Sequence, residues 1–222
     1  MWLILIAVIV GVALVFALWW FSADQVARRA MRKVPMRVIR DVLEGEKARI
    51  VGEAAGDAPI PAPLSGRSCF YWRVTVEEYR RRGKHGSWRT IIDEQEGVDF
   101  VVKDGTGKAW IRASHVHSLL EKDARFASGI LNDAGPELEA FLARHGHSSE
   151  GLLFNKNMRY REGVVEPGEA VAVVGIGRWA QDPDEPAQAA AGYRDMVTPK
   201  RLVMEPPEDG PLLLSDESKM KH

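Results

Sequence analysis

The sequence predicts an N-terminal transmembrane helix followed by a mainly-β (α+β) domain with one or two short helices. Residues 1–21 carry no charge, and only Gly11 among them falls outside the apolar set. The 30 basic and 31 acidic residues of the 222-residue chain lie beyond this run, where short apolar segments alternate with Gly, Pro and charged turns. No second apolar run approaches the roughly 18 residues of a membrane span. The composition excludes a polytopic transporter, a disordered chain and a freely soluble cytosolic protein.

The apolar run fits a membrane anchor in its length and at its ends. A helix over residues 1–21 would be about 31 Å long, close to the roughly 30 Å of a bilayer core. Trp2 and Trp19 stand where interfacial aromatic rings lie. A cleaved signal peptide is the less favoured alternative, because no basic residue precedes the run and bulky Trp19, Trp20 and Phe21 occupy positions where small residues precede a cut.

A basic segment follows the predicted anchor. Residues 22–40 carry six basic side chains and one acidic one, Asp24. By the positive-inside rule this flank stays in the cytoplasm and the short N-terminus points outward. In the preferred interpretation, these charges only set the orientation of the chain in the membrane. In a second interpretation, they contact anionic lipid. The membrane-proximal basic residues are Arg28, Arg29, Arg32 and Lys33.

The same segment has the signals of a short helix. Ser22 and Gln25 have the spacing of a capping box, and Pro35 interrupts the helical pattern. We therefore expect a helix over residues 23–34 within a juxtamembrane linker, residues 22–37.

Residues 38–205 predict one β-rich domain. Residues 47–53 form the first expected strand. Residues 69–79 alternate between apolar and polar side chains, which predicts a half-buried strand whose partner is residues 87–94 across a polar tip. The face expected to be buried carries Phe70, Trp72, Val74 and Val76.

A second hairpin is marked by its turn. Residues 99–103 and 108–112 flank a tip of residues that tolerate positive φ. The tip is not a phosphate loop, which would need Gly at the position of Val102 and Ser or Thr at that of Ala109. The tip residues are Asp104, Gly105, Thr106 and Gly107.

The rest of the domain is less regular. Residues 136–145 predict a helix, residues 169–175 a buried strand and residues 201–205 the last strand. Residues 181–198, rich in Ala, Pro and Asp, are expected to form an inserted loop, and residues 206–222 a C-terminal tail. The order of these elements resembles a partly open barrel of the oligonucleotide/oligosaccharide-binding (OB) type.

Scattered motifs carry a family resemblance. The motif residues are Pro63, Ser65, Gly66, Tyr71, Asp104, Gly105, Gly107, Tyr160, Glu162, Pro167, Gly168, Gly175, Pro206 and Pro207. In this order behind one apolar helix, they resemble the GIDE or beside-a-membrane (BAM) domain family of MULAN-like mitochondrial ubiquitin ligases and their bacterial relatives. The resemblance covers residues 38–215. It implies a stand-alone member in a bacterial inner membrane that binds a partner through these residues.

Ubiquitin ligases of that family add a RING domain, which holds two zinc ions with about eight Cys and His ligands. Cys69 is the one cysteine of this chain, so no RING is expected. The resemblance leaves an alternative, an accessory role in ubiquitin-like conjugation with the RING supplied by another chain.

No set of side chains in the sequence points to catalysis, a cofactor or a metal. Cys69 opens an alternating strand, where a small packing residue fits. Ser65 lacks the strained elbow of a serine nucleophile. Two HxH pairs lack a supporting acidic or cysteine ligand at a set spacing. These pairs are His115 with His117 and His145 with His147.

The tip of the first hairpin combines basic and aromatic side chains. We expect first a solvated tip that blocks edge pairing and second a contact with anionic lipid or a protein. Nucleic acid is the least favoured partner. The candidate contacts are Arg80, Arg81, Arg82, Lys84 and Trp88.

The sequence therefore predicts a single-pass, membrane-anchored binding domain without catalysis of its own. Its expected partners are the lipid bilayer and a protein or membrane-associated ligand, with the domain in the cytoplasm.

Overall fold

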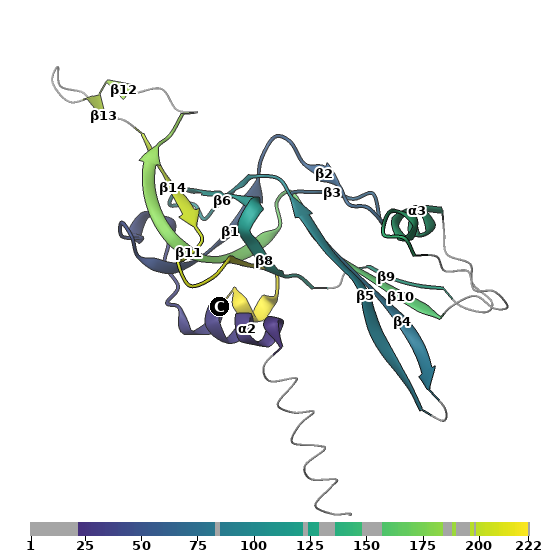
Figure 1. Cartoon of the computed structure of the whole chain (residues 1–222). Coiled ribbons are helices and arrows are strands. Elements are labelled where there is room, and N and C mark those ends of the chain that lie inside the picture. The colour runs from purple at the N-terminus through teal and green to yellow at the C-terminus, as the bar shows by residue number, and fades with distance from the viewer. Residues whose placement is uncertain are drawn as a thin grey trace, which may run out of the picture.

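The described part of the chain is a mainly-β domain with a closed, mixed five-stranded barrel and two short helices (Figure 1). A computed structural model describes residues 22–82, 85–121, 124–128, 136–147, 157–183, 188–189, 196–197 and 199–221. The predicted anchor, residues 1–21, lies outside these ranges. Within them, no helix is long and apolar enough to cross a membrane.

Five strands form the barrel, and their pairing closes the ring. In order around the barrel they are β1 (Lys47–Ala55), β6 (Phe100–Lys103), β7 (Lys108–Ile111), β14 (Lys200–Glu205) and β11 (Ala170–Gln181). The pair of β7 and β14 is parallel and the other four pairs are antiparallel.

A partly open barrel was expected, and the closed ring corrects that prediction. Strand β11 is longer than the predicted residues 169–175 and pairs along different parts of its length with two other strands of the barrel. Its first part lies against β1, from Ala170↔Glu53 to Ile176↔Lys47. Its second part lies against β14 as far as Gln181. One long strand therefore supplies both neighbours that close the ring.

The C-terminal segment is folded, and the prediction of a tail over residues 206–222 is wrong. Strand β15 (Leu212–Ser215) pairs with β11, and β8 (Val116–Leu119) pairs in parallel with β15. Leu212 and Leu214 belong to the barrel core, whereas Leu213 packs on the opposite side of the strand. The chain then makes a short 3₁₀ turn, Ser218–Met220, with Met220 fully buried.

A second sheet stands beside the barrel (Figure 1). Its antiparallel strands follow the order β5 (His85–Gly97), β4 (Tyr71–Arg82), β10 (Met158–Val165) and β9 (Ala124–Ser128). The sheet is built from two insertions, since β4 and β5 lie between β1 and β6 in the chain, and β9 and β10 between β7 and β11.

The alternation predicted for β4 is confirmed from Trp72 to Val76, but Phe70, predicted on the same buried face, packs elsewhere. Trp72, Val74 and Val76 are buried on one face, packed in the cluster that also holds helix α3 (Pro136–Arg144). Phe70 and Tyr71 instead join the barrel core, because the chain passes from the barrel into the second sheet at this point. The predicted helix over residues 136–145 and the hairpin from β4 to β5 are both confirmed.

Smaller elements complete the fold. The predicted inserted loop, residues 181–198, contains a two-stranded pair in its described part. The small elements are β2 (Ile60–Pro61), β3 (Ser68–Cys69), β12 (Gln188–Ala189), β13 (Met196–Val197) and two 3₁₀ turns, Ile39–Asp41 and Ala113–His115.

Candidate ligand-binding groove

Helix α2 (Ala23–Lys33) packs across the barrel with its apolar side. Ala27 and Met31 are buried against Ala172 and Val174 of β11 and Leu213 of β15. The spacing of the two helix residues, four apart, puts both on one face. The helix itself is as predicted, but the capping box is not formed, since no side-chain hydrogen bond caps its N-terminus.

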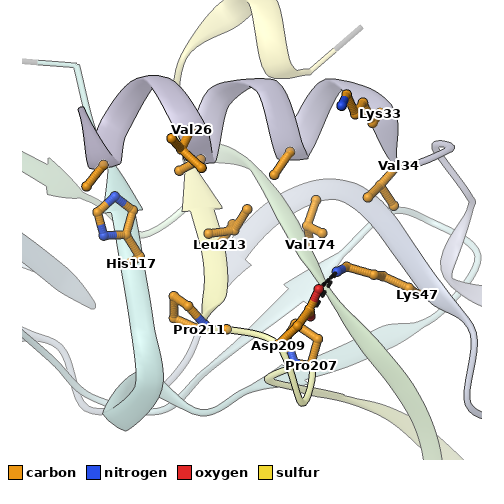
Figure 2. A pocket seen from close by; sticks show the side chains of 14 residues that line it. Val26, Lys33, Val34, Lys47, His117, Val174, Pro207, Asp209, Pro211 and Leu213 are labelled. Carbon is orange, nitrogen blue, oxygen red and sulfur yellow. Dashed lines mark hydrogen bonds and ion pairs between the residues drawn. The ribbon is translucent and has the colours of Figure 1, made fainter. Parts of the chain in front are cut away.

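An apolar groove runs along one side of α2 (Figure 2). Its volume is about 690 Å³, within the range of small-molecule sites. Three alanines of α2 leave room between the helix, the strands below it and the loop before β15. The lining residues are Ala23, Val26, Ala27, Ala30 and Lys33 of α2, Val34 directly after it, and Lys47, His117, Val174, Pro207, Asp209, Gly210, Pro211 and Leu213.

Charged side chains lie at the edge of the groove and leave its interior apolar. Figure 2 shows Val174 and Leu213 beneath the helix and the loop of Pro207 and Pro211 opposite. Lys47 Nζ lies 3.2 Å from Asp209 Oδ1 across this loop. The groove therefore combines an apolar interior with two lysines at its edge, Lys33 and the paired Lys47.

Ion pairs fix α2 in place at both sides. Arg73 of β4 lies 3.2 Å from Asp24 through Nη1 and 2.8 Å from Asp93 through Nη2. Arg73 Nη1 also donates to the Ser118 carbonyl at 2.8 Å. One turn on, Arg28 Nη2 lies 2.6 Å from Glu217 Oε1. These contacts join the helix to the second sheet and to the C-terminal segment.

The acidic residue of the helix has a shifted pKa. The pKa of Asp24 falls from 3.8 to about 2. The largest cause is the contact with His117, whose Nε2 lies 3.2 Å away. The positive charge of Arg73 and its hydrogen bond lower the pKa further, and together these contacts outweigh the opposing effect of partial burial.

Asp24→Asn is expected to lower the melting temperature near neutral pH and to lose that effect in acid. Because folding lowers the pKa, the carboxylate contributes stability above pH 3.8 that disappears as pH falls through about 2. The Asp24 side chain is 38% exposed, so screening reduces the contribution to about 1 kcal/mol. Melting curves of both proteins from neutral pH to pH 2 measure it, with Asp57→Asn as an exposed control. A difference that stays constant with pH would contradict the assignment.

The predicted membrane-proximal basic residues divide into two groups. Arg28 is engaged by Glu217, and Lys33 lines the groove. Arg32 is exposed on α2, and Arg29 is partly buried. Of the predicted basic residues, Arg28 therefore helps to hold the helix in place, whereas Arg32 and Lys33 are exposed.

Several motif residues meet around a buried carboxyl group. Glu162 of β10 is fully buried. Its Oε1 accepts a hydrogen bond from Leu64 N at 2.9 Å, and its Oε2 accepts one from Ser65 N at 3.2 Å. Gly66 turns the same loop with φ +69°. The structure thus brings Ser65, Gly66 and Glu162 together, next to Pro63, in a loop anchor.

Other motif residues hold turns and buried contacts. The Asp104 carboxylate accepts hydrogen bonds from the backbone N–H of Ile39 at 2.7 Å and of Thr106 at 2.8 Å. A Cβ on Gly107 would lie 2.9 Å from Ile39, and one on Gly175 2.7 Å from a backbone oxygen. Positive φ angles occur at Gly105, in the predicted turn after Asp104, and at Gly168, which follows Pro167 between β10 and β11.

The remaining motif residues lie apart from one another. The Tyr71 hydroxyl donates to the Val116 carbonyl at 3.3 Å, and the Tyr160 hydroxyl to Met158 Sδ at 3.3 Å. Pro206 is exposed after β14, whereas Pro207 lines the groove. The motif set therefore marks the scaffold and touches the groove at Pro207.

The cysteine and histidine residues considered above as nucleophiles or metal ligands have different partners and do not form one site. Burial first, and then the nearby Glu162 charge, raises the pKa of the Cys69 thiol to about 11, so it packs as a neutral thiol. His117 faces Asp24, while His145 Nε2 lies 3.2 Å from Glu94 Oε2. Within the described ranges, no group of three or more His, Cys, Asp or Glu residues is arranged to hold a metal ion.

The basic hairpin tip is partly described. Arg80 Nε lies 2.6 Å from Glu78 Oε2, Arg81 is exposed, and Trp88 is 40% exposed. The side chain of Arg82, at the end of β4, and all of Lys84 lie outside the described part.

Comparison of the chain with protein families, with curated proteins and with solved structures found no match.

Sequence reasoning missed the groove. Its walls come from α2, from the strands β1, β8, β11 and β15 and from the loop before β15. Two signals were present: apolar or small residues at helical spacing along residues 23–34, and three leucines after Gly210 and Pro211. The first signal indicates an amphipathic helix and the second a strand buried on both faces, and together they would have suggested that the helix packs on the strand.

Proposed function

We propose that the chain is a membrane-anchored binding domain, without catalysis of its own, that takes an aliphatic chain from the membrane into the groove beside α2. The single observation that carries the proposal is the apolar groove of about 690 Å³. Its ligand is the membrane-associated partner that the sequence predicts.

Three features of the groove favour an aliphatic chain. The apolar lining includes Val26, Ala30, Val174 and Leu213, whose side chains offer no hydrogen bonds to a polar ligand. Lys33 and the paired Lys47 stand at the edge, where they suit the anionic end of an amphiphile. Helix α2 begins at Ala23, directly after the predicted anchor, so the groove would open near the bilayer surface.

We also propose that the barrel is of the OB type. With β1, β6, β7, β11 and β14 numbered one to five, the order around the barrel is one, two, three, five, four. This Greek-key order supports an OB-type barrel. On this proposal the chain is a GIDE-type domain anchored by residues 1–21, with the barrel on the cytoplasmic side. The ubiquitin-related alternative rests on the resemblance alone.

Ala30→Trp is expected to abolish lipid labelling of the groove loop. The full chain is placed in phosphatidylcholine nanodiscs that contain a diazirine-bearing palmitate, irradiated and digested with trypsin. In the wild type, adducts are expected on the peptide 202–219, which contains Pro207 and Leu213. An indole at Ala30 fills the groove and should reduce these adducts about tenfold, as mass spectrometry would measure.

Two further variants separate blocking from unfolding. Ala143→Trp makes the same change on an exposed position of α3 and should leave labelling unchanged. Val26→Asp places a charge in the lining at a position already 47% exposed, so it should reduce labelling without loss of the fold. A wild-type peptide 202–219 without adducts, or equal labelling in all variants, would contradict the proposal.

A further inference from the structure

The β4–β5 hairpin extends beyond its own sheet. Strand β10 pairs with β4 only as far as Met158↔Glu78, whereas β4 and β5 continue to pair up to Arg82↔His85. Asn157, the residue before β10, still accepts a hydrogen bond from Tyr79 N at 2.9 Å, and beyond this point β4 and β5 continue as a two-stranded ribbon, residues 79–82 and 85–88, that β10 does not flank. Two strands alone bury little surface, so side chains on the ribbon are available for a contact. Figure 1 shows the ribbon projecting past the body on the side where α2 lies.

Aromatic rings occupy one face of the ribbon. Tyr79 and Trp88 are cross-strand partners, with ring centroids 5.3 Å apart. They are 38% and 40% exposed, respectively. The Arg159 guanidinium lies 4.3 Å above the Trp88 ring, and a Cβ on Gly86 would collide with the Tyr79 ring. The two rings are thus held in place at the surface, although neither is buried.

Basic side chains project from both faces of the ribbon. Arg81 shares the face of Tyr79, whereas Arg80 and Arg89, which stands opposite Glu78 in the register, project from the other face. The Arg81 and Arg89 side chains are exposed. Arg80 reaches Glu78 at 2.6 Å but keeps 56% of its side chain exposed. The ribbon therefore carries two amphipathic rings on one face and exposed arginines on both.

We propose that this ribbon is a second membrane contact, which places Tyr79 and Trp88 among the headgroups of an anionic leaflet. Tyr and Trp rings favour the bilayer interface, and arginines near the surface are attracted to anionic lipid. The ribbon lies on the same side as α2, which follows the predicted anchor, so both elements would meet one bilayer. The inference rests on the membrane attachment of the proposed function and is independent of the ligand in the groove.

A fluorescent label on the ribbon tests this contact. Ser87 is exposed on β5, and Cys69 is fully buried with its pKa raised to about 11, so a thiol-reactive dye should label Ser87→Cys and leave Cys69 unmodified. The full chain is placed in nanodiscs of phosphatidylcholine alone or mixed equally with phosphatidylglycerol. We expect a blue shift of the dye emission in the anionic nanodiscs that is lost at high salt.

Matched variants test whether the contact depends on the arginine charges and on the position of the dye. Arg80→Ser with Arg81→Ser should abolish the shift in the anionic nanodiscs. Asp57→Cys, an exposed site in the loop before β2, should show no shift in either lipid. The wild-type chain, treated with the dye, should remain unlabelled.

The outcomes separate this inference from the proposed function. A chain that co-elutes with the nanodiscs but shows no shift, or shows the same shift in both lipids, overturns the ribbon contact alone. A chain that stays outside both kinds of nanodisc overturns the anchoring and the ribbon contact together. A shift caused by a single-stranded oligonucleotide and not by anionic lipid would also overturn it, in favour of nucleic acid.

Discussion

Leu214→Ala is expected to lower the free energy of unfolding by about 3 kcal/mol. Leu214 is fully buried in the barrel core and stands opposite Val173 of β11 in the register. Truncation to alanine removes buried methyl groups and leaves a cavity between two strands that cannot easily close around it. Urea denaturation of the full chain in mild detergent, followed by tryptophan fluorescence, measures the loss.

The matched control lies in the same C-terminal segment. Glu208 is exposed in the loop before β15, and Glu208→Ala should change the free energy of unfolding by less than about 0.5 kcal/mol. If residues 206–222 were a tail, both substitutions would be neutral. A small effect of Leu214→Ala would therefore argue against strand β15 and against the groove wall that it forms.

The elements that the sequence predicted well have local causes. The alternation along β4 follows from one buried face, as Trp72, Val74 and Val76 show. The hairpin at Asp104 and Gly105 is specified by its own turn, where Gly105 adopts φ +82°. Helix α3 is also local, since its apolar spacing falls between a proline and a glycine.

The missed elements depend on distant parts of the chain. Strand β15 has three leucines in a row, and no alternation, because the barrel covers one of its faces and α2 the other. Closure of the barrel depends on β11 pairing with β1, more than one hundred residues earlier. A strand buried on both faces loses the period that identifies it, and a ring cannot be closed from local patterns.

The candidate site was harder to predict than the fold. The motif residues that support the family resemblance mostly hold turns and close approaches, as Gly107 and Gly175 do. The groove depends instead on the absence of bulk at Ala23, Ala27 and Ala30. Small residues are poor signals in a sequence, since they fit a solvent-exposed helix as well as the wall of a groove.

Glu162→Ala is expected to lower the free energy of unfolding by about 3 to 4 kcal/mol. The carboxyl group of Glu162 is fully buried and accepts hydrogen bonds from the backbone N–H groups of Leu64 and Ser65. Alanine would leave both donors without an acceptor, each at a cost of about 1 kcal/mol or more, and would add a cavity beneath the loop. The same urea titration measures the global effect, and hydrogen exchange of the two amides measures the local one.

Two other substitutions show which part of the effect is hydrogen bonding. Glu162→Gln keeps the volume but turns one acceptor into a donor facing an N–H group, so its loss should be intermediate and its effect on exchange should be larger at one amide than at the other. Ser65→Ala removes a hydroxyl that lies 3.4 Å from Arg67 N and leaves the bonds to Glu162 in place, so it should be nearly neutral. If the amides of Leu64 and Ser65 exchanged at the wild-type rate in Glu162→Ala, the carboxyl group would not be what holds this loop. Faster exchange confined to those amides would identify Glu162 as the residue that ties the loop of Pro63 and Gly66 to the second sheet.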